Sequence, residues 1–459
     1  MSHNSFSMPL QHAAIAVSGE AIGEDVPLQG VSTDTRQIQP GELFVALQGP
    51  NFDGHDYLQQ ARDKGAVAAL VSRRPGGQET LPLIVVDDTR LALGRLANAW
   101  RRRLKPTLVA VTGSNGKTTV KEMLASIFGA ALGPDAVLAT HGNLNNDIGV
   151  PLTLLRLNAA HRIAIIEMGA NHAGEIAYLT GIAEPDVGVI TNAAAAHLEG
   201  FGSLLGVARA KGELFAGLPK GSRAIINADD AFAADWREIA TQQTVTSFGL
   251  IRAADVQARW QHGPQGNQVA IETESGSMQV HIALLGTHSV MNALAATATA
   301  LALDVSLSHI KAGLETMQPV PGRLQLKAGY HGSRVIDDTY NANPASLAAA
   351  LNALKDFPGK HLLALGEMAE LGPEAEAIHS AAGRQALERG VDDLYALGKL
   401  AAAAAGVFGS ARVFDSHDAI VAALKKELDN DVTLLVKGSR RSHMERVVVA
   451  LTEPERLEV

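Results

Sequence analysis

The stretch LVAVTGSNGKTTVKEML, residues 108–124, decides the fold of the middle of this chain. A run of β-branched and other apolar residues passes into glycine and polar residues, and apolar residues then return at helical spacing. This order predicts a buried strand, a tight turn and a helix. Glycines let the backbone of such a turn approach an anion, and the N–H groups of the turn and of the helix N-terminus face it. Residues 113–118 are therefore predicted to form a phosphate-binding turn.

The spacing of this turn departs from the usual P-loop, which has four residues between its two glycines. Here only Ser114 and Asn115 separate the glycines. The physical basis is retained, because Lys117 can reach the outer phosphates and the hydroxyl of Thr118 can bind Mg²⁺. The alternative is an ordinary connection with a chance Gly-Lys-Thr sequence. The correct order of strand, turn and helix disfavours that alternative.

Length and composition exclude several classes of protein. A chain of 459 residues is too long for one core and predicts about three domains. No apolar run approaches the roughly 20 residues that cross a bilayer, and the N-terminus lacks the features of a secretion signal. The net charge of −9 argues against a nucleic-acid scaffold, and zero cysteines exclude disulfides and thiolate metal sites. We expect a cytoplasmic monomer without nucleic-acid or membrane partners.

Three segments differ in their pattern of strands and helices. Residues 1–90 contain short strands with turn residues between them, and a polar helix follows that ends before Pro106. Residues 91–320 alternate strands and helices, which predicts a central P-loop-type, doubly wound, mostly parallel sheet. After the Pro-rich MQPVPGR, residues 321–459 alternate again and predict a Rossmann-like α/β domain. The expected fold is therefore α/β with three domains, the first of them small.

Three residues of the middle segment could bind a metal ion. Glu167 falls at the carboxyl end of a buried strand, where it is either a turn residue or a metal ligand beside the phosphate-binding turn. His197 follows the next strand, and its expected position at the same edge of the sheet favours a ligand over an ordinary polar residue. Lys211 lies on the following helix. It is either a solvated lysine or an unprotonated amine that adds CO₂ and becomes a carbamate ligand.

Other polar residues cluster at strand ends and helix starts. Asn143, Asn145 and Asn146 fall in one loop, which suggests hydrogen bonding to a polar ligand, although a single asparagine there would be a turn residue. Each of the remaining candidates is a weak signal alone: Asn292 at a helix start, Arg323 at the second boundary, and Asp338, Asn341 and Asn343 in IDDTYNANPAS.

Taken together and in this order, these residues resemble the Mur ligases, ATP-dependent enzymes that form amide bonds in the cytoplasmic stage of peptidoglycan synthesis. The resemblance covers nearly the whole chain and also implies three domains. It rests on Thr112-Gly113-x-x-Gly116-Lys117-Thr118-Thr119 followed by Glu167, His197, Lys211, Asn292, Arg323 and Asp338.

Within the family, STDTRQIQPGELFVALQGPNFDGHDYL resembles the UDP-binding first domain of the late-acting members. DDTYNANPAS and LALGEMAELG resemble the member that joins D-alanyl-D-alanine to UDP-N-acetylmuramoyl-tripeptide through an acyl phosphate. The Asp-Asn-Pro-Arg signature of the diaminopimelate-adding member is absent. The resemblance does not say whether the third residue of the tripeptide is diaminopimelate or lysine.

The resemblance also implies roles for individual residues. ATP would be bound by Gly113, Ser114, Asn115, Gly116, Lys117, Thr118, Thr119, Asn292, Arg323 and Asp338. One Mg²⁺ would be held by Thr118 and Glu167, and a second by Glu167, His197 and carbamylated Lys211. Catalysis would involve Lys117, His197 and Lys211. UDP would lie near Ser32, Thr33, Asp34 and Arg36, and the acceptor dipeptide near Asn341 and Asn343. Since Arg323 and Asp338 lie beyond the middle domain, we expect domain closure to complete the site.

Three other functions remain as alternatives. A P-loop switch or motor would turn over ATP without small-molecule acceptors, but Glu167, His197 and Lys211 have no evident purpose in it. A catalytically inactive regulatory protein is disfavoured by the intact Lys117 and Thr118. Folylpolyglutamate synthase shares the phosphate-binding turn, but the long UDP-type first domain argues against it.

Overall fold

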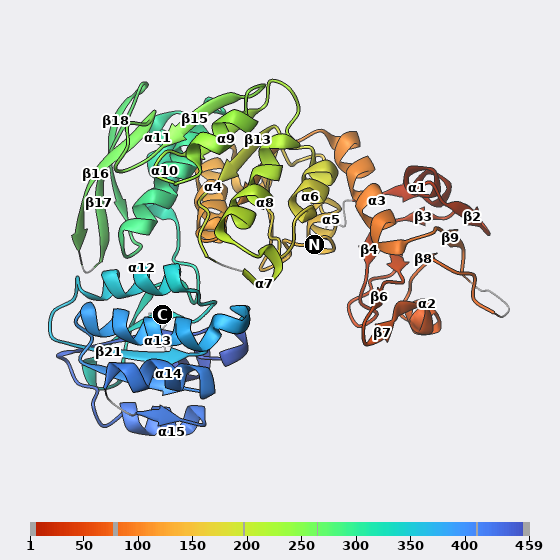
Figure 1. Cartoon of the computed structure of the whole chain (residues 1–459). Helices are drawn as coiled ribbons and strands as arrows, with labels where there is room; N and C mark the ends of the chain where they lie inside the picture. The colour runs from red at the N-terminus through yellow and green to blue at the C-terminus, as the bar shows by residue number, and fades with distance from the viewer. Residues whose placement is uncertain (1–5, 77–80, 196–197, 264, 410–411, 453–459) are drawn as a thin grey trace, which may run out of the picture.

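The computed structural model describes residues 6–76, 81–195, 198–263, 265–409 and 412–452. Three sheet-based domains follow one another along the chain. In Figure 1 the middle domain lies between the first domain, at the right, and the third domain, at the lower left. No helix within the described ranges is both long and apolar enough to cross a membrane.

The middle domain is built on a nine-stranded sheet whose strand order reverses at β10. Strand β10 (Thr107–Thr112) lies between β12 (Ile163–Glu167) and β13 (Val187–Ile190), and it is parallel to both. From β10 the chain adds strands first on one side and then on the other. In such sheets, ligands bind at the carboxyl ends of the strands where the order reverses. The full order is β11 (Val137–Ala139), β12, β10, β13, β14 (Arg223–Asn227), β15 (Thr244–Phe248), β16 (Val256–Gly263), β17 (Gly266–Thr273) and β18 (Gly276–Ile282).

Both faces of the middle sheet are covered by helices, which is why its central strands are apolar throughout. Along β10, Val109 and Val111 pack into one core cluster, while Leu108 and Ala110 pack into another. The first cluster includes residues of α4 (Lys117–Leu132), α10 (Thr287–Leu301) and α11 (Leu307–Thr316). The second includes residues of α3 (Thr89–Leu104), α5 (Gly149–Leu154), α6 (Glu175–Ala183), α8 (Leu204–Ala216) and α9 (Ala233–Ile239). The predicted doubly wound, mostly parallel sheet is thereby confirmed; only β16–β17 and β17–β18 pair antiparallel.

The first domain contains a small mixed sheet that is joined to the middle domain by α3. Asp88 caps α3, because its side chain accepts hydrogen bonds from the N–H groups of Arg90 and Leu91. Residues of α1 and α3 share one core cluster with the middle sheet, so the apolar interior is continuous across this connection. The elements of the five-stranded sheet and its helices are β2 (Glu20–Ile22), β9 (Leu83–Val85), β8 (Ala68–Val71), β5 (Leu43–Val45), β4 (Val31–Ser32), α1 (Leu10–Val17) and α2 (Leu58–Asp63).

The third domain has a six-stranded sheet in which every pair is parallel except β19–β20. Helices α12 to α14 cover one face and α15 and α16 the other, as expected for a Rossmann-like domain. Strand β24 lies between β20 and β21, so the carboxyl ends of β20 and β24 meet at a second reversal of strand order. The strands are β19 (Gln325–Ala328), β20 (Arg334–Asp338), β24 (Val432–Lys437), β21 (Lys360–Gly366), β22 (Asp393–Leu397) and β23 (Val413–Phe414). The helices are α12 (Pro344–Leu354), α13 (Ala375–Glu388), α14 (Lys399–Phe408), α15 (His417–Leu424) and α16 (Glu445–Leu451).

Candidate active site

The phosphate-binding turn has no room for side chains at its two glycines. Gly113 and Gly116 have φ angles of +145° and +84°, which other residues rarely adopt. A Cβ at Gly113 would lie 2.0 Å from Thr191 Oγ1, and one at Gly116 would lie 2.3 Å from Asn292 Oδ1. The turn is therefore packed from behind by the end of β13 and by α10, which leaves its other side for a ligand.

Hydrogen bonds from the segment after β13 hold this turn in place. Asn115 donates its N–H to Asn192 Oδ1 at 3.0 Å, and its carbonyl accepts from Thr191 Oγ1 at 2.6 Å and Asn192 Nδ2 at 3.0 Å. Ser114 Oγ donates to the carbonyl of Ala194 at 3.1 Å and accepts from the Ala194 N–H at 2.9 Å. The turn is thus preorganised by its neighbour. Neither Thr191 nor Asn192 was predicted as a site residue, although both lie at the end of a predicted strand.

Lys117 begins α4 with its ammonium group folded over the turn. Its Nζ donates to the carbonyls of Gly113 at 2.7 Å and Ser114 at 3.1 Å. Burial lowers the pKa of Lys117, and the charge of Glu167 opposes this effect. The positive charge and the helix N-terminus are therefore directed at the same place, as an anionic phosphate requires.

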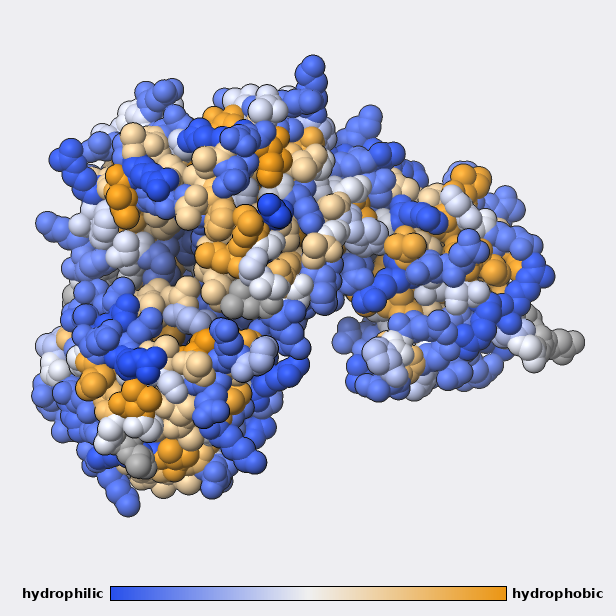
Figure 2. All heavy atoms as spheres, viewed as in Figure 1, coloured by the Kyte–Doolittle hydropathy of each residue, from blue (hydrophilic) through white to orange (hydrophobic). Residues whose placement is uncertain are grey.

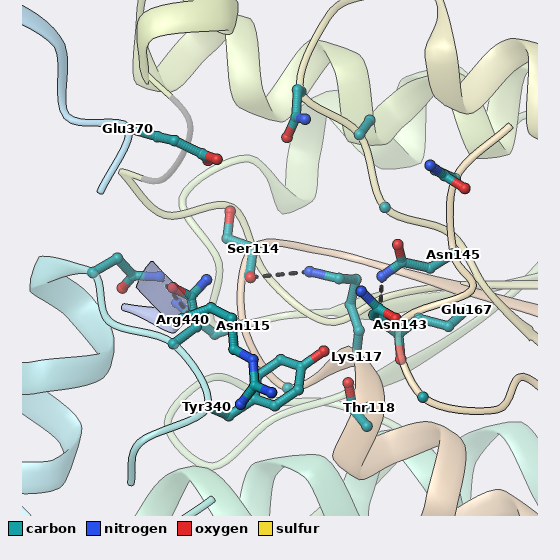
Figure 3. A pocket seen from close by; sticks show the side chains of 18 of the residues that line it. Ser114, Asn115, Lys117, Thr118, Asn143, Asn145, Glu167, Tyr340, Glu370 and Arg440 are labelled. Carbon is teal, nitrogen blue, oxygen red and sulfur yellow. Dashed lines mark hydrogen bonds between the residues drawn. The ribbon is translucent and has the colours of Figure 1, made fainter. Parts of the chain in front are cut away.

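Glu167 and Thr118 supply oxygen atoms beside the turn (Figure 3). Glu167 is only 2% exposed; its Oε1 accepts from Asn145 Nδ2 at 2.8 Å, whereas its Oε2 is buried and has no hydrogen-bond partner. Thr118 Oγ1 accepts from Arg323 Nη2 at 2.9 Å. A buried carboxylate oxygen without a partner fits a cation, and Mg²⁺ prefers oxygen ligands.

A site for Mg²⁺ here would need oxygens from outside the protein. Among the described residues, no group of three or more His, Cys, Asp or Glu side chains could hold a metal ion. Mg²⁺ is commonly bound by one or two protein ligands together with substrate phosphates and water. The arrangement of Glu167 and Thr118 beside the phosphate-binding turn fits that mode of binding.

Lys211 is buried in α8, with 2% of its surface exposed. Its Nζ lies 5.3 Å from the centre of the Phe201 ring. Burial, reinforced by the charge of Lys117, lowers the pKa of Lys211 to about 7. A large fraction of the amine is therefore unprotonated near neutral pH, which is the form that reacts with CO₂. The remaining expected metal ligand, His197, lies outside the described residues.

The third domain contributes a charged wall opposite the turn. The guanidinium of Arg323 lies 4.2 Å above the centre of the Tyr340 ring. Lys437 Nζ lies 2.5 Å from Asp338 Oδ2 and donates to the carbonyl of Asn341 at 3.0 Å. These contacts fix the loop that follows β20. In Figure 3, Tyr340 and Arg440 lie across from Glu167 and Asn145, with Lys117 between them.

The turn, the amide-rich loop, α3 and the third domain enclose a cavity of about 1320 Å³. The expected site residues on its wall are Ser114, Asn115, Gly116, Lys117, Thr118, Asn143, Asn145, Asn146, Glu167, Arg323, Asp338, Asn341 and Asn343. Those described but not on its wall are Gly113, Thr119, Lys211, Asn292, Ser32, Thr33, Asp34 and Arg36. Polar wall residues that the sequence analysis did not single out include Arg90, Asp147, Glu175, Tyr178 and Glu370. No local pattern marks them, because the cavity wall is assembled from several elements, some of them far apart in the chain.

The first-domain candidates form a self-contained turn after β4. Arg36 and Asp34 form an ion pair at 2.7 Å, and hydrogen bonds from the Arg36 side chain lower the pKa of Asp34. Ser32 Oγ donates to the carbonyl of Asp34 at 3.1 Å and accepts from the Asp34 N–H at 3.2 Å. This turn belongs to the right-hand domain of Figures 1 and 2, apart from the cavity. In the view of Figure 2, open space separates the first and third domains.

Comparison with sequence families places most of the chain in one family. Residues 27–101 match the description "Mur ligase family, catalytic domain". Residues 111–300 match "Mur ligase middle domain", and residues 322–440 match "Mur ligase, glutamate ligase domain".

Individual proteins resemble the chain over nearly its whole length. The UDP-N-acetylmuramoyl-tripeptide–D-alanyl-D-alanine ligase of Escherichia coli K12 is 44% identical over 452 residues, which is 97% of this chain and 99% of that protein. The crystal structure of MurF from Acinetobacter baumannii is 37% identical, with a TM-score of 0.90 over 96% of this chain and 98% of its own. MurF ligase from Thermotoga maritima, solved in complex with ADP, is 28% identical, with a TM-score of 0.82 over 92% of this chain and 96% of its own. The chain therefore belongs to the Mur ligase family.

Proposed function

We propose that this chain uses ATP to join D-alanyl-D-alanine to UDP-N-acetylmuramoyl-tripeptide, giving the pentapeptide, ADP and phosphate. The observation that carries the proposal is one cavity in which Lys117, the N-terminus of α4 and the unpartnered oxygen of Glu167 converge. The 44% identity to a ligase of this specificity, over 97% of the chain, supports the choice of substrates. The reaction would belong to cytoplasmic peptidoglycan precursor synthesis, with the enzyme acting as a monomer.

The chemistry requires activation of a carboxylate, which is a poor electrophile. The γ-phosphoryl group of ATP would move to the terminal carboxylate of the tripeptide and form an acyl phosphate. The free amine of the dipeptide would then attack the carbonyl carbon, and phosphate would leave from the tetrahedral intermediate. The first step brings two anions together, so Lys117 and the N-terminus of α4 lower its barrier by stabilising the transferring phosphoryl group.

Mg²⁺ fits the residues beside the turn. Thr118 and Glu167 would hold one ion, and Glu167, His197 and carbamylated Lys211 a second. Bound there, Mg²⁺ would neutralise phosphate charge and orient the phosphates. Asn145 fixes the orientation of the Glu167 carboxylate through its 2.8 Å hydrogen bond, which leaves Oε2 directed away from protein partners.

The other parts of the substrates would bind on either side of the turn. Arg323 and Asp338 would contact the nucleotide from the third domain, and Asn143 and Asn146 would contact the tripeptide. Asn292 would act from behind the turn, since it touches Gly116 and does not line the cavity. Ser32, Thr33, Asp34 and Arg36 would bind UDP in the first domain. We further propose domains at residues 1–90, 91–320 and 321–459.

A phosphate-release assay tests the function. ATP and Mg²⁺ are supplied with both acceptors, and the UDP-tripeptide and the dipeptide are then omitted in turn. Phosphate release and formation of the pentapeptide are expected only in the complete mixture. Sustained ATP turnover without either acceptor would instead indicate a nucleotide-driven switch or motor and would overturn the proposal.

A further inference from the structure

A hydrogen bond between two asparagine side chains joins the third domain to the phosphate-binding turn. Asn343 Nδ2 donates to Asn115 Oδ1 at 2.9 Å. The two residues are 228 positions apart in the sequence. Because Asn115 lies within the turn, this contact connects the third domain with the nucleotide site itself.

The side of the bond that belongs to the turn is rigid. The backbone N–H and carbonyl of Asn115 are both engaged by the segment after β13, through Asn192 and Thr191. The Asn115 side chain extends from this fixed backbone toward the third domain. A displacement of Asn343 would therefore be transmitted to the turn, because the backbone of Asn115 cannot rotate freely.

The other side of the bond is equally constrained. Asn343 is the N-cap of α12: its Oδ1 accepts from the Ser346 N–H at 2.8 Å, and its own N–H donates to Ser346 Oγ at 3.0 Å. The side-chain oxygen of Asn343 thus caps the helix, and its side-chain N–H donates to Asn115. Both ends of this side chain thus have a protein partner, which fixes its orientation, while one N–H of its amide stays available to the cavity.

A second contact crosses from the third domain, and it is made by Arg323. The guanidinium of Arg323 stacks on the Tyr340 ring and donates to Thr118 Oγ1 at 2.9 Å. Lys437 ties the loop together by contacting both Asp338 and Asn341. The loop at residues 338–343 is therefore held together, and its Tyr340 ring supports Arg323, so we expect the contacts of Arg323 and Asn343 with the turn to form or break together.

We propose that Asn343 is a positioning residue that latches the third domain onto the phosphate-binding turn. Docking of the third domain then adds a further restraint to a turn that its own domain already holds, so nucleotide binds most tightly when the third domain is in place. The biological meaning of this coupling rests on the proposed function, in which residues of the third domain contact the nucleotide. The coupling itself requires no acceptor.

The variant Asn343→Ser tests the latch on the full chain. Serine is a good N-cap and retains the bond to the Ser346 N–H, but it is too short to reach Asn115. ADP binding, measured by calorimetry with Mg²⁺ and no other substrate, is expected to weaken about five-fold, the equivalent of one neutral hydrogen bond. Amide exchange at residues 113–118 of the nucleotide-free protein is expected to quicken. Asn343→Thr, which also preserves the cap, is expected to behave in the same way.

Ser346→Ala is the matched control. It removes the reciprocal half of the capping box and leaves the bond between Asn343 and Asn115 in place. Its ADP affinity and its exchange at residues 113–118 are expected to match the wild type, with any loss confined to the stability of α12. Equal weakening of ADP binding by Ser346→Ala and Asn343→Ser would overturn the latch, because loss of the helix cap would then explain both.

A double-mutant cycle separates the latch from a direct role in acceptor binding. If the two residues act through one bond, Asn343→Ser has no further effect on ADP binding in an Asn115→Ala background. Additive effects would overturn the proposal. An Asn343→Ser protein with unchanged ADP affinity and exchange but a raised KM for the dipeptide would also overturn it, while leaving the ligase function intact. Conversely, ADP binding and exchange can reveal the latch even if the acceptor is not D-alanyl-D-alanine.

Discussion

At the scale of single residues, the candidate site depends on positions where only one residue type is compatible with the surroundings. Gly116 combines a φ of +84° with a Cβ position 2.3 Å from Asn292 Oδ1. Gly116→Ala is expected to abolish ADP binding in a calorimetric titration, because the strain of about 1–2 kcal/mol adds to a clash with a buried side chain. Gly133→Ala, at the other end of α4, has a φ of +87° with nothing within 4 Å of its Cβ, and should leave ADP binding unchanged. Equal ADP affinity in the two variants would contradict this account of the turn.

Lys211 provides a second residue-scale prediction. Lys211→Ala is expected to lose nearly all activity in the phosphate-release assay, because it removes the amine that would carry the carbamate. Small carboxylic acids should restore part of the activity by occupying the carbamate's place, whereas they should not affect the wild type. Full activity in Lys211→Arg would rule out a carbamate, since a guanidinium stays protonated and does not add CO₂.

At the scale of elements, the sequence predicted the buried strands well but missed two edge strands. Strands β10, β12 and β13 were predicted because each is a continuous apolar run buried on both faces. The edge strands β11 and β19 were not predicted. β11 has only three residues and β19 alternates half-buried with exposed positions, so neither carries a strong apolar signal.

The first turn of α10 makes stability depend on pH. Burial lowers the pKa of His288 to about 4, although Asp338 opposes this effect; Lys437 and His262 act in the same direction as burial. Between pH 6.5 and 4 the unfolded chain therefore binds a proton that the folded chain does not, so stability falls as the pH falls through this window. The free energy of unfolding falls by at most about 3 kcal/mol. The loss is smaller than this limit because water reaches part of the His288 ring. Urea unfolding at pH 7 and pH 4.5 should show a smaller difference for His288→Gln than for the wild type; an unchanged difference would exclude His288 as the cause.

At the scale of the whole molecule, the third domain already contacts the phosphate-binding turn through Arg323 and Asn343. The first domain is connected through α3 and, in the view of Figure 2, stands apart from the third. Domain closure is therefore expected to bring the first domain nearer to the third. Small-angle scattering should show a smaller radius of gyration with UDP-tripeptide and an ATP analogue together than with the analogue alone. Identical dimensions with and without both ligands would contradict closure.

The sequence by itself determined the order of strands and helices, the phosphate-binding turn and the position of Glu167 at a strand end. These features depend on neighbours along the chain, and the alternation of apolar and polar residues reports them directly. Only the tertiary structure decided that Asn292 lies behind Gly116, that Arg90 and Arg440 line one cavity, and that Asn343 bonds to Asn115. Such contacts join segments far apart in the sequence, and their geometry comes from how helices and domains pack against each other, for which no local pattern exists.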